Sequence, residues 1–175
     1  TNYVDVPIVN AGDGTHEHPT QALLDIMSIK EKFGKVKGLK IGIVGDILHS
    51  RVALSNIFGL VKLGAKVKLC APPHLLKRNI EHLGVSVTYD VDELIEWADA
   101  INVLRIQKER MGLGLIPSVR EYRTFFGITN ERIKRHKKEI VLMHPGPINR
   151  GVEIDSEVAD SDQAIILDQV LNGVA

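Results

Sequence analysis

Five short apolar runs that alternate with amphipathic stretches restrict the fold of this chain more than any other feature. The apolar runs occupy residues 39–44, 66–71, 85–89, 100–104 and 140–143. Stretches of helical character occupy residues 18–33, 50–63, 75–82, 91–97, 118–137 and 161–171. Strands that alternate with helices are typical of βαβ units in a parallel sheet. The expected fold is therefore α/β: a three-layer α/β/α, Rossmann-like domain with a parallel sheet of four to five strands.

The composition argues against several classes of protein. The 175 residues include 22 Lys plus Arg and 22 Asp plus Glu, and a net charge of zero disfavours a nucleic-acid partner. No apolar run approaches the roughly 18 residues of a membrane span, so no membrane partner is expected. The one cysteine, Cys70, cannot form a disulfide framework or a multi-cysteine zinc site. A single cysteine in an apolar run favours a reducing compartment, and the predicted location is cytoplasmic.

Two arginines follow predicted strands, at the edge of the sheet where parallel α/β domains bind their ligands. Arg51 begins the helix after the run at 39–44, and Arg105 directly follows the run at 100–104. Gln107 lies two residues beyond Arg105 on an extended segment, so both side chains point the same way. Arginine suits bidentate binding of carboxylate or phosphate, and two of them favour a ligand with two anionic groups. The alternative is that each arginine forms an ordinary surface salt bridge.

Two further motifs flank the same edge. His18-Pro19-Thr20-Gln21 starts a helix, whose positive end lowers the pKa of a histidine, so a neutral His18 could donate to a carbonyl oxygen. Gln21 would lie on the same side of that helix start. The turn His144-Pro145-Gly146-Pro147 has few N–H donors, so its carbonyl groups could accept from an amine or amide. The alternatives are a simple helix cap at His18 and a rigid turn at 144–147.

Cofactor and metal sites have weak support. Residues 42–46 contain Gly-x-x-Gly after a strand start, but the dinucleotide pattern Gly-x-Gly-x-x-Gly is not completed. His16 and His18 are two residues apart without a carboxylate pattern, so no metal site is expected. The polar, glycine-rich stretch 106–119 reads as a long loop, and a loop of that length is usually functional. We expect no cofactor and no metal.

Taken together, the motifs resemble one family, the aspartate carbamoyltransferases. The matching segments occur in family order over nearly the whole chain: Asn10-Ala11-Gly12-Asp13-Gly14, His18-Pro19-Thr20-Gln21, Val44-Gly45-Asp46 with Arg51, Arg105-Ile106-Gln107-Lys108-Glu109-Arg110, and His144-Pro145-Gly146-Pro147 with Asn149-Arg150-Gly151. Each segment alone is weak, and the set is specific.

The resemblance covers the C-terminal, aspartate-binding part of that family. The family's carbamoyl-phosphate domain carries a Ser-Thr-Arg-Thr motif and a mobile loop lysine, and neither is found in this sequence. Residues 1–14 are expected to be the residual strand and linker of that missing domain, and residues 15–175 the aspartate-binding domain, truncated at the C-terminal helix. The chain starts at Thr1 and stops at Ala175 within an apolar helix-like stretch, so we expect a fragment.

Two alternatives to an aspartate enzyme stay open. The related ornithine carbamoyltransferases share the His-Pro-x-Gln helix start, but carry a His-Cys-Leu-Pro turn and lack the Arg-x-Gln-x-Glu-Arg loop. Two arginines suit a dicarboxylate and would repel the cationic side chain of ornithine. The second alternative is a non-catalytic Rossmann-like binding module. Intact His18, Arg51, Arg105 and Gln107 argue against such degeneration.

The resemblance implies a reaction and a role for each site residue. L-Aspartate attacks carbamoyl phosphate and gives N-carbamoyl-L-aspartate and phosphate, in de novo pyrimidine biosynthesis. The implied catalytic residues are His18, Arg51 and Arg105; the implied substrate-binding residues are His18, Gln21, Arg51, Arg105, Gln107, Pro145, Gly146 and Pro147. Family members form homotrimers, and a regulatory subunit or a dihydroorotase is a candidate partner. The fragment alone is expected to be inactive.

Overall fold

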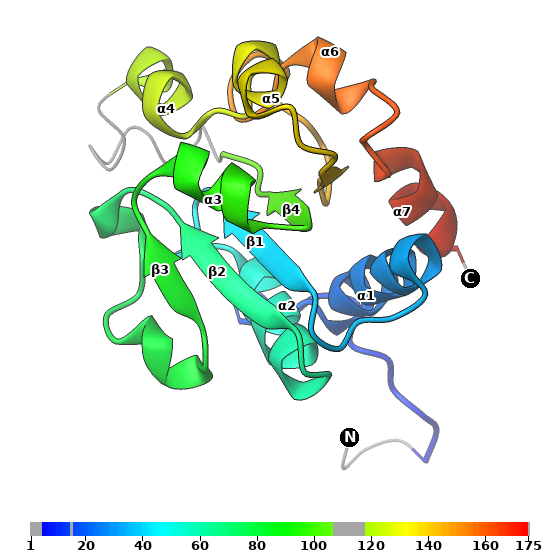
Figure 1. Cartoon of the computed structure of the whole chain (residues 1–175). Coiled ribbons are helices and arrows are strands. Elements are labelled where there is room, and N and C mark those ends of the chain that lie inside the picture. The colour runs from blue at the N-terminus through cyan, green and yellow to red at the C-terminus, as the bar shows by residue number, and fades with distance from the viewer. Residues whose placement is uncertain (1–4, 15, 107–117, 175) are drawn as a thin grey trace.

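The apolar runs form one five-stranded parallel sheet in the computed structural model, which describes residues 5–14, 16–106 and 118–174 (Figure 1). The strands are β1 (Lys40–Val44), β2 (Lys66–Cys70), β3 (Ser86–Thr88), β4 (Ala100–Val103) and β5 (Val141–Met143). Their order is β3-β2-β1-β4-β5, and all four neighbouring pairs are parallel. The predicted α/β class and the upper limit of five strands are confirmed.

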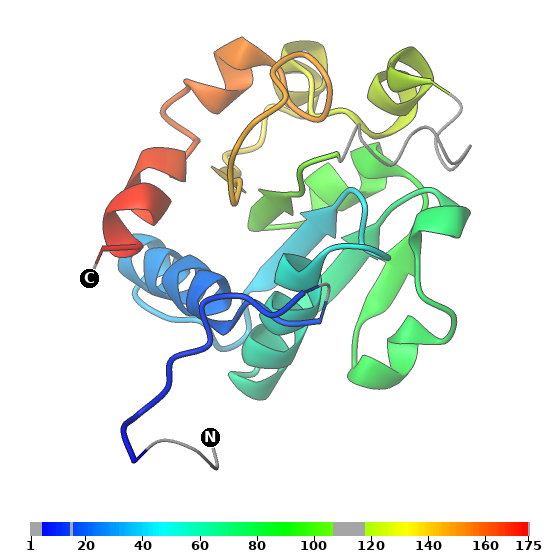
Figure 2. The same ribbon diagram turned by 180° about the vertical axis from the view of Figure 1, so that it is seen from behind.

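Helices cover both faces of the sheet. Helices α1 (Pro19–Phe33) and α2 (Arg51–Lys62) pack side by side on one face, seen from the front in Figure 2. Helix α3 (Val91–Trp97) covers the other face with buried Leu94 and Ile95. Helices α4 (Val119–Phe126), α5 (Asn130–His136), α6 (Ser156–Ala159) and α7 (Ile166–Asn172) complete the described structure. None of the described helices combines the length and apolar character needed to cross a membrane.

Local sequence signals position the two helices that begin at the carboxyl edge of the sheet. Pro19 opens α1, where its missing N–H breaks no hydrogen bond, and Gly34 ends the helix in a left-handed conformation with φ of 71°. The Ser50 side chain caps α2 by accepting from the Ala53 N–H at 3.1 Å. Gly45, with φ of 133°, follows β1 and lies against Leu104, the residue after β4. Only glycine allows this close approach, because a Cβ at position 45 would lie 2.8 Å from Leu104 Cβ.

The helix predicted at 75–82 is wrong. The chain instead forms two short 3₁₀ turns, η1 (Pro73–Leu75) and η2 (Ile80–Leu83). Asn79 lies between them in a left-handed conformation, with φ of 57°. One left-handed residue interrupts a helical hydrogen-bond ladder, so the apolar spacing of this segment serves burial of Leu75 and Ile80 rather than helix formation.

Tertiary pairing also alters the C-terminal half. The charged region 118–137 consists of two helices, because Ile128 forms a β-bridge with Ile154 between them. The tail helix predicted at 161–171 begins only at Ile166, because Ala164 bridges Leu142 and extends the sheet. Helix α6 was not predicted from the sequence.

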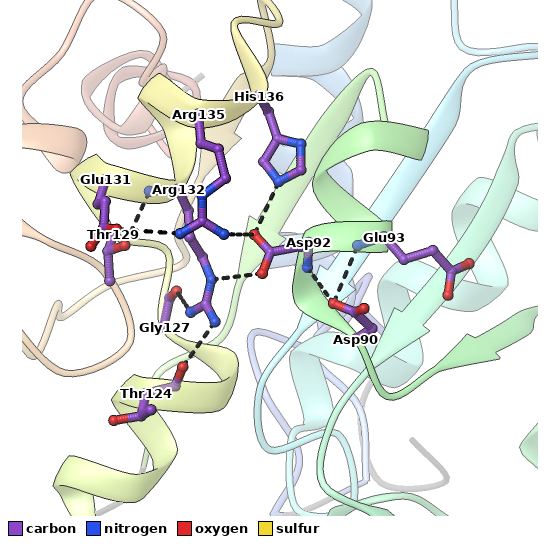
Figure 3. A network of polar contacts seen from close by, with 10 residues as sticks. All are labelled: Asp90, Asp92, Glu93, Thr124, Gly127, Thr129, Glu131, Arg132, Arg135 and His136. Atoms are coloured by element: carbon purple, nitrogen blue, oxygen red, sulfur yellow. Dashed lines mark hydrogen bonds and ion pairs between the residues drawn. The ribbon is translucent and has the colours of Figure 1, made fainter.

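A polar network joins the α4–α5 junction to α3 (Figure 3). The Arg132 guanidinium donates to Asp92 Oδ2 at 3.2 Å and to the carbonyl groups of Gly127 and Thr124, each at 2.8 Å. His136 Nε2 lies 3.0 Å from Asp92 Oδ1. Partial burial raises the pKa of Asp92, but hydrogen bonds and charge from His136 and Arg132 outweigh it, so this pKa lies below its usual value. Asp92 therefore stabilises the fold in its ionised form.

Replacing Arg132 with alanine should lower the free energy of unfolding by about 2–4 kcal/mol, because three hydrogen bonds to a largely buried charge are lost. The loss should be measured by urea unfolding at neutral pH. The Asp92 contribution should be present above the ordinary carboxyl pKa and disappear as pH falls through the lowered pKa. Arg135→Ala is the matched control: this guanidinium also lies near Asp92, at 3.9 Å, but its side chain is 57% exposed against 14% for Arg132, so its loss should cost much less. Equal losses in the two variants would contradict the assigned role of Arg132.

Candidate active site

A pocket of about 370 Å³ opens at the carboxyl ends of β1, β4 and β5, where the connections from β1 and β4 leave the sheet in opposite directions. Its lining is Gly14, His18, Gln21, Asp46, His49, Ser50, Arg51, Val52, Leu104, Arg105, Pro145, Gly146 and Pro147. The structure therefore brings together every residue predicted for the site except Gln107, which lies outside the described residues, as does most of the predicted loop 106–119.

Arg51 is held by the segment that precedes α1. Its Nη1 donates to the Gly14 carbonyl at 3.3 Å, and a Cβ on Gly12 would lie 2.8 Å from the same nitrogen. Gly12 adopts φ of 134°, a conformation that side-chain-bearing residues rarely reach, so glycine permits this close approach. Among the residues that the structure describes, no carboxylate forms an ion pair with Arg51, so the surface salt bridge considered as an alternative is not seen there.

Arg105 enters the pocket from the end of β4. The following residue, Ile106, is fully buried, and its carbonyl accepts from Asn149 Nδ2 at 2.8 Å. This hydrogen bond ties the segment after β4 to the segment after β5. Arg105 therefore lies beside the 144–147 turn, on a backbone anchored by buried packing.

His18 occupies the N-cap position of α1, but its side chain does not cap the helix. Its backbone N–H donates to Ser55 Oγ at 2.9 Å, and its Nδ1 lies 3.3 Å from Thr20 Oγ1. Burial and the nearby charge of Arg51 lower the pKa of His18, which favours the neutral imidazole. If Nδ1 accepts from Thr20, the ring proton resides on Nε2, where it can be donated to a ligand.

The turn after β5 carries acceptors into the pocket. The peptide bond between Gly146 and Pro147 is cis, and the Gly146 N–H donates to His144 Nδ1 at 2.9 Å. His144 is buried, and its Nε2 lies 3.3 Å from Glu153 Oε1. Since Pro145 and Pro147 have no N–H and that of Gly146 is used internally, the turn offers carbonyl oxygens to a ligand.

Two groups of polar residues around the pocket received no role from the sequence, although Asp46 was part of a family motif. Asp46 follows β1 and lines the pocket, and its Oδ1 lies 2.9 Å from His49 Nδ1. A second group, beneath the pocket, is fully buried and consists of Asp25, Asn56 and Asn102. The side-chain amides of the two asparagines both donate to the Asp25 carboxylate. The detectable signals were the polar strand end at Asp46 and an asparagine inside the apolar run at 100–104.

Comparison with known proteins decides the family. Residues 37–175 match the model of the aspartate/ornithine carbamoyltransferase Asp/Orn-binding domain, and residues 1–31 match that of the carbamoyl-phosphate-binding domain. The chain belongs to the aspartate/ornithine carbamoyltransferase family. The resemblance inferred from the motifs is thereby confirmed.

Individual members of the carbamoyltransferase family agree with this assignment. The aspartate carbamoyltransferase catalytic subunit of Christiangramia forsetii is 61% identical over 175 residues, which are 100% of this chain and 56% of that protein. The aspartate transcarbamoylase of Trypanosoma cruzi in complex with aspartate and phosphate superposes with a TM-score of 0.79 at 32% identity, covering 98% of this chain and 55% of that one. The ornithine carbamoyltransferase of Pyrococcus furiosus gives 0.79 at 28% identity, covering 99% and 57%. The chain thus spans about half the length of these relatives.

Proposed function

We propose that this chain is the aspartate-binding part of a carbamoyltransferase that converts carbamoyl phosphate and L-aspartate to N-carbamoyl-L-aspartate and phosphate, in de novo pyrimidine biosynthesis. The observation that carries the proposal is one pocket that holds two arginines, Arg51 and Arg105, beside His18 and an acceptor-rich turn. Two cations fit a dicarboxylate and disfavour the cationic side chain of ornithine. The 61% identity to an aspartate carbamoyltransferase catalytic subunit supports the same choice.

In the proposed reaction, the pocket acts by orientation and charge stabilisation. Arg51 and Arg105 bind the two carboxylates of aspartate, with support from Gln107, and so aim its amino group at the carbamoyl carbon. His18 donates to the carbamoyl oxygen, where negative charge develops as the nitrogen–carbon bond forms. Gln21 and the carbonyls of Pro145 and Gly146, beside Pro147, hold the carbamoyl NH₂. Phosphate departs and can itself take the proton.

The proposed protein is longer than this chain. Residues 1–14 would complete a carbamoyl-phosphate domain, and residues 15–175 would form the aspartate-binding domain. The family models divide the chain later, because the match to the carbamoyl-phosphate-binding domain extends to residue 31 and so includes most of α1. From the family resemblance we further propose a cytoplasmic homotrimer, with a regulatory subunit or a dihydroorotase as a candidate partner. The name "catalytic subunit" of the 61% identical relative supports an assembly of several chains.

The direct test is an assay of the complete protein with radiolabelled carbamoyl phosphate and either L-aspartate or L-ornithine. Labelled N-carbamoyl-L-aspartate should accumulate. No label should appear in citrulline, the product of carbamoyl transfer to ornithine. Transfer to ornithine in preference to aspartate would refute the assignment of the arginines. Absence of transfer to both amino acids would refute a catalytic role.

A polypeptide of these 175 residues alone should show no measurable carbamoyl transfer. The pocket contains groups for aspartate and for the carbamoyl end of the donor, but the family's phosphate-binding motif is not in the sequence. Without contacts to its phosphate group, carbamoyl phosphate is bound weakly and is not oriented for attack by aspartate. The same radiolabel assay, with the complete protein as positive control, measures this; turnover by the shorter polypeptide would contradict it.

A further inference from the structure

A buried carboxylate beneath the pocket, that of Asp25 on α1, accepts four side-chain hydrogen bonds. Its Oδ1 accepts from Gln21 Nε2 at 3.0 Å and from Gln169 Nε2 at 2.7 Å. Its Oδ2 accepts from Asn56 Nδ2 at 2.7 Å and from Asn102 Nδ2 at 3.0 Å. The four amides come from α1, α7, α2 and β4, so one carboxylate joins four elements around the site.

Independent contacts fix the orientation of two of these amides. Gln169 Oε1 accepts the backbone N–H of His144 at 2.9 Å, which leaves its Nε2 to face Asp25. Asn56 Nδ2 also donates to the Val52 carbonyl at 3.2 Å, so its NH₂ group is the one placed at the carboxylate. Both oxygens of Asp25 therefore act as acceptors. Burial raises the pKa of Asp25, whereas the hydrogen bonds from the four amides lower it. Since all four of its contacts are N–H donors, the carboxyl group is bound as an acceptor only, which is the geometry of the ionised form.

Gln21 is the one amide of this group that also lines the pocket. With Nε2 on the carboxylate, its carbonyl oxygen is the group left for a ligand. The reversed amide would bring Oε1 against an oxygen of Asp25, where two acceptors repel each other. The buried carboxylate thus gives Gln21 a single orientation, in which the pocket gains an acceptor rather than a donor.

The same carboxylate reaches the second set of acceptors. Through Gln169 it is linked to the backbone N–H of His144, the first residue of the 144–147 turn, which carries the Pro145 and Gly146 carbonyls. The acceptors assigned to the carbamoyl NH₂ are the Gln21 side chain and the turn carbonyls, which lie far apart in the sequence. Both are connected by hydrogen bonds to the Asp25 carboxylate.

We propose that Asp25 is a positioning residue that makes the pocket select a carbamoyl group, whose NH₂ donates hydrogen bonds, over an acetyl group of nearly the same shape, whose methyl does not. The inference rests on the proposed function and adds a reason why the enzyme would prefer carbamoyl phosphate to acetyl phosphate as the substrate that supplies the transferred group. A site built to accept hydrogen bonds from a ligand discriminates against an analogue that lacks the donor, because the site's polar groups are then left unpaired.

The test uses the complete protein as wild type, Asp25→Asn and Ser28→Ala. For each, we would measure the KM for carbamoyl phosphate and the Ki of acetyl phosphate as a competitor. In Asp25→Asn, a side-chain NH₂ faces the surrounding N–H donors, and the Gln21 amide is free to reverse. The ratio of the acetyl phosphate Ki to the carbamoyl phosphate KM should therefore fall about tenfold. Ser28→Ala removes a bond from Asn172 to buried Ser28 Oγ, 2.9 Å long, and so perturbs α1 and α7 without touching Gln21. Its ratio should stay at the wild-type value.

Each outcome bears on the proposal. A loss of affinity for both phosphates by the same factor in Asp25→Asn, with an unchanged ratio, would mean that Asp25 is merely structural. If Asp25→Asn does not fold, Gln21→Leu replaces it, because three donors to Asp25 remain and the position lies at the pocket surface; an unchanged ratio in that variant also overturns the proposal. An inactive wild type would instead refute the proposed function itself.

Discussion

Replacing Arg105 with alanine in the complete protein should raise the KM for L-aspartate about 100-fold, the order expected when one partner of a partly buried charged hydrogen-bonded pair is removed. The KM for carbamoyl phosphate should change by less than about threefold, since the proposed function assigns its phosphate to the carbamoyl-phosphate domain and not to Arg105. The reason is geometric: Arg105 follows β4 on a buried backbone, and the pocket places it beside Arg51 and the 144–147 turn. Initial rates over a matrix of both substrate concentrations separate the two constants.

Arg135→Ala is the control for this measurement. It removes an exposed arginine that pairs with Glu131 at 3.3 Å and lies outside the pocket, so both KM values should stay at the wild-type level. Equal increases in the two KM values of Arg105→Ala would count against a role for Arg105 in binding aspartate.

Replacing His18 with alanine should lower kcat by about 100- to 1,000-fold, the effect typical of losing one donor to a developing oxyanion. Burial and the charge of Arg51 lower the pKa of His18, so its imidazole is already neutral at pH 7 and keeps one N–H to donate. His18→Gln should recover part of the rate, because an amide NH₂ can donate from a similar position.

Single-turnover rates at saturating substrates would measure the chemical step directly. His74→Ala serves as the control, because His74 is exposed and lies outside the pocket. A kcat for His18→Ala within a few-fold of wild type would contradict the assignment. Failure of His18→Gln to exceed His18→Ala would argue that the imidazole does more than donate one hydrogen bond.

Local patterns predicted the framework of this fold well. All five apolar runs became strands, and signals such as Pro19, Gly34 and Ser50 located the helices next to the pocket. The predictions failed where long-range pairing overrode spacing. The run from 75 to 82 is interrupted by left-handed Asn79, and Ala164 pairs with β5 instead of entering a helix.

The sequence by itself determined the parallel α/β class and a site at the strand ends, because apolar periodicity and helix starts are local properties. It also placed Arg51, Arg105, His18 and the 144–147 turn at that edge. Only the tertiary structure decided how the pocket is supported from below. The partners of Asp25 lie 31, 77 and 144 residues away, at Asn56, Asn102 and Gln169. Hydrogen bonds over such separations leave no periodic trace in a sequence, since they form only once the sheet has brought four elements together.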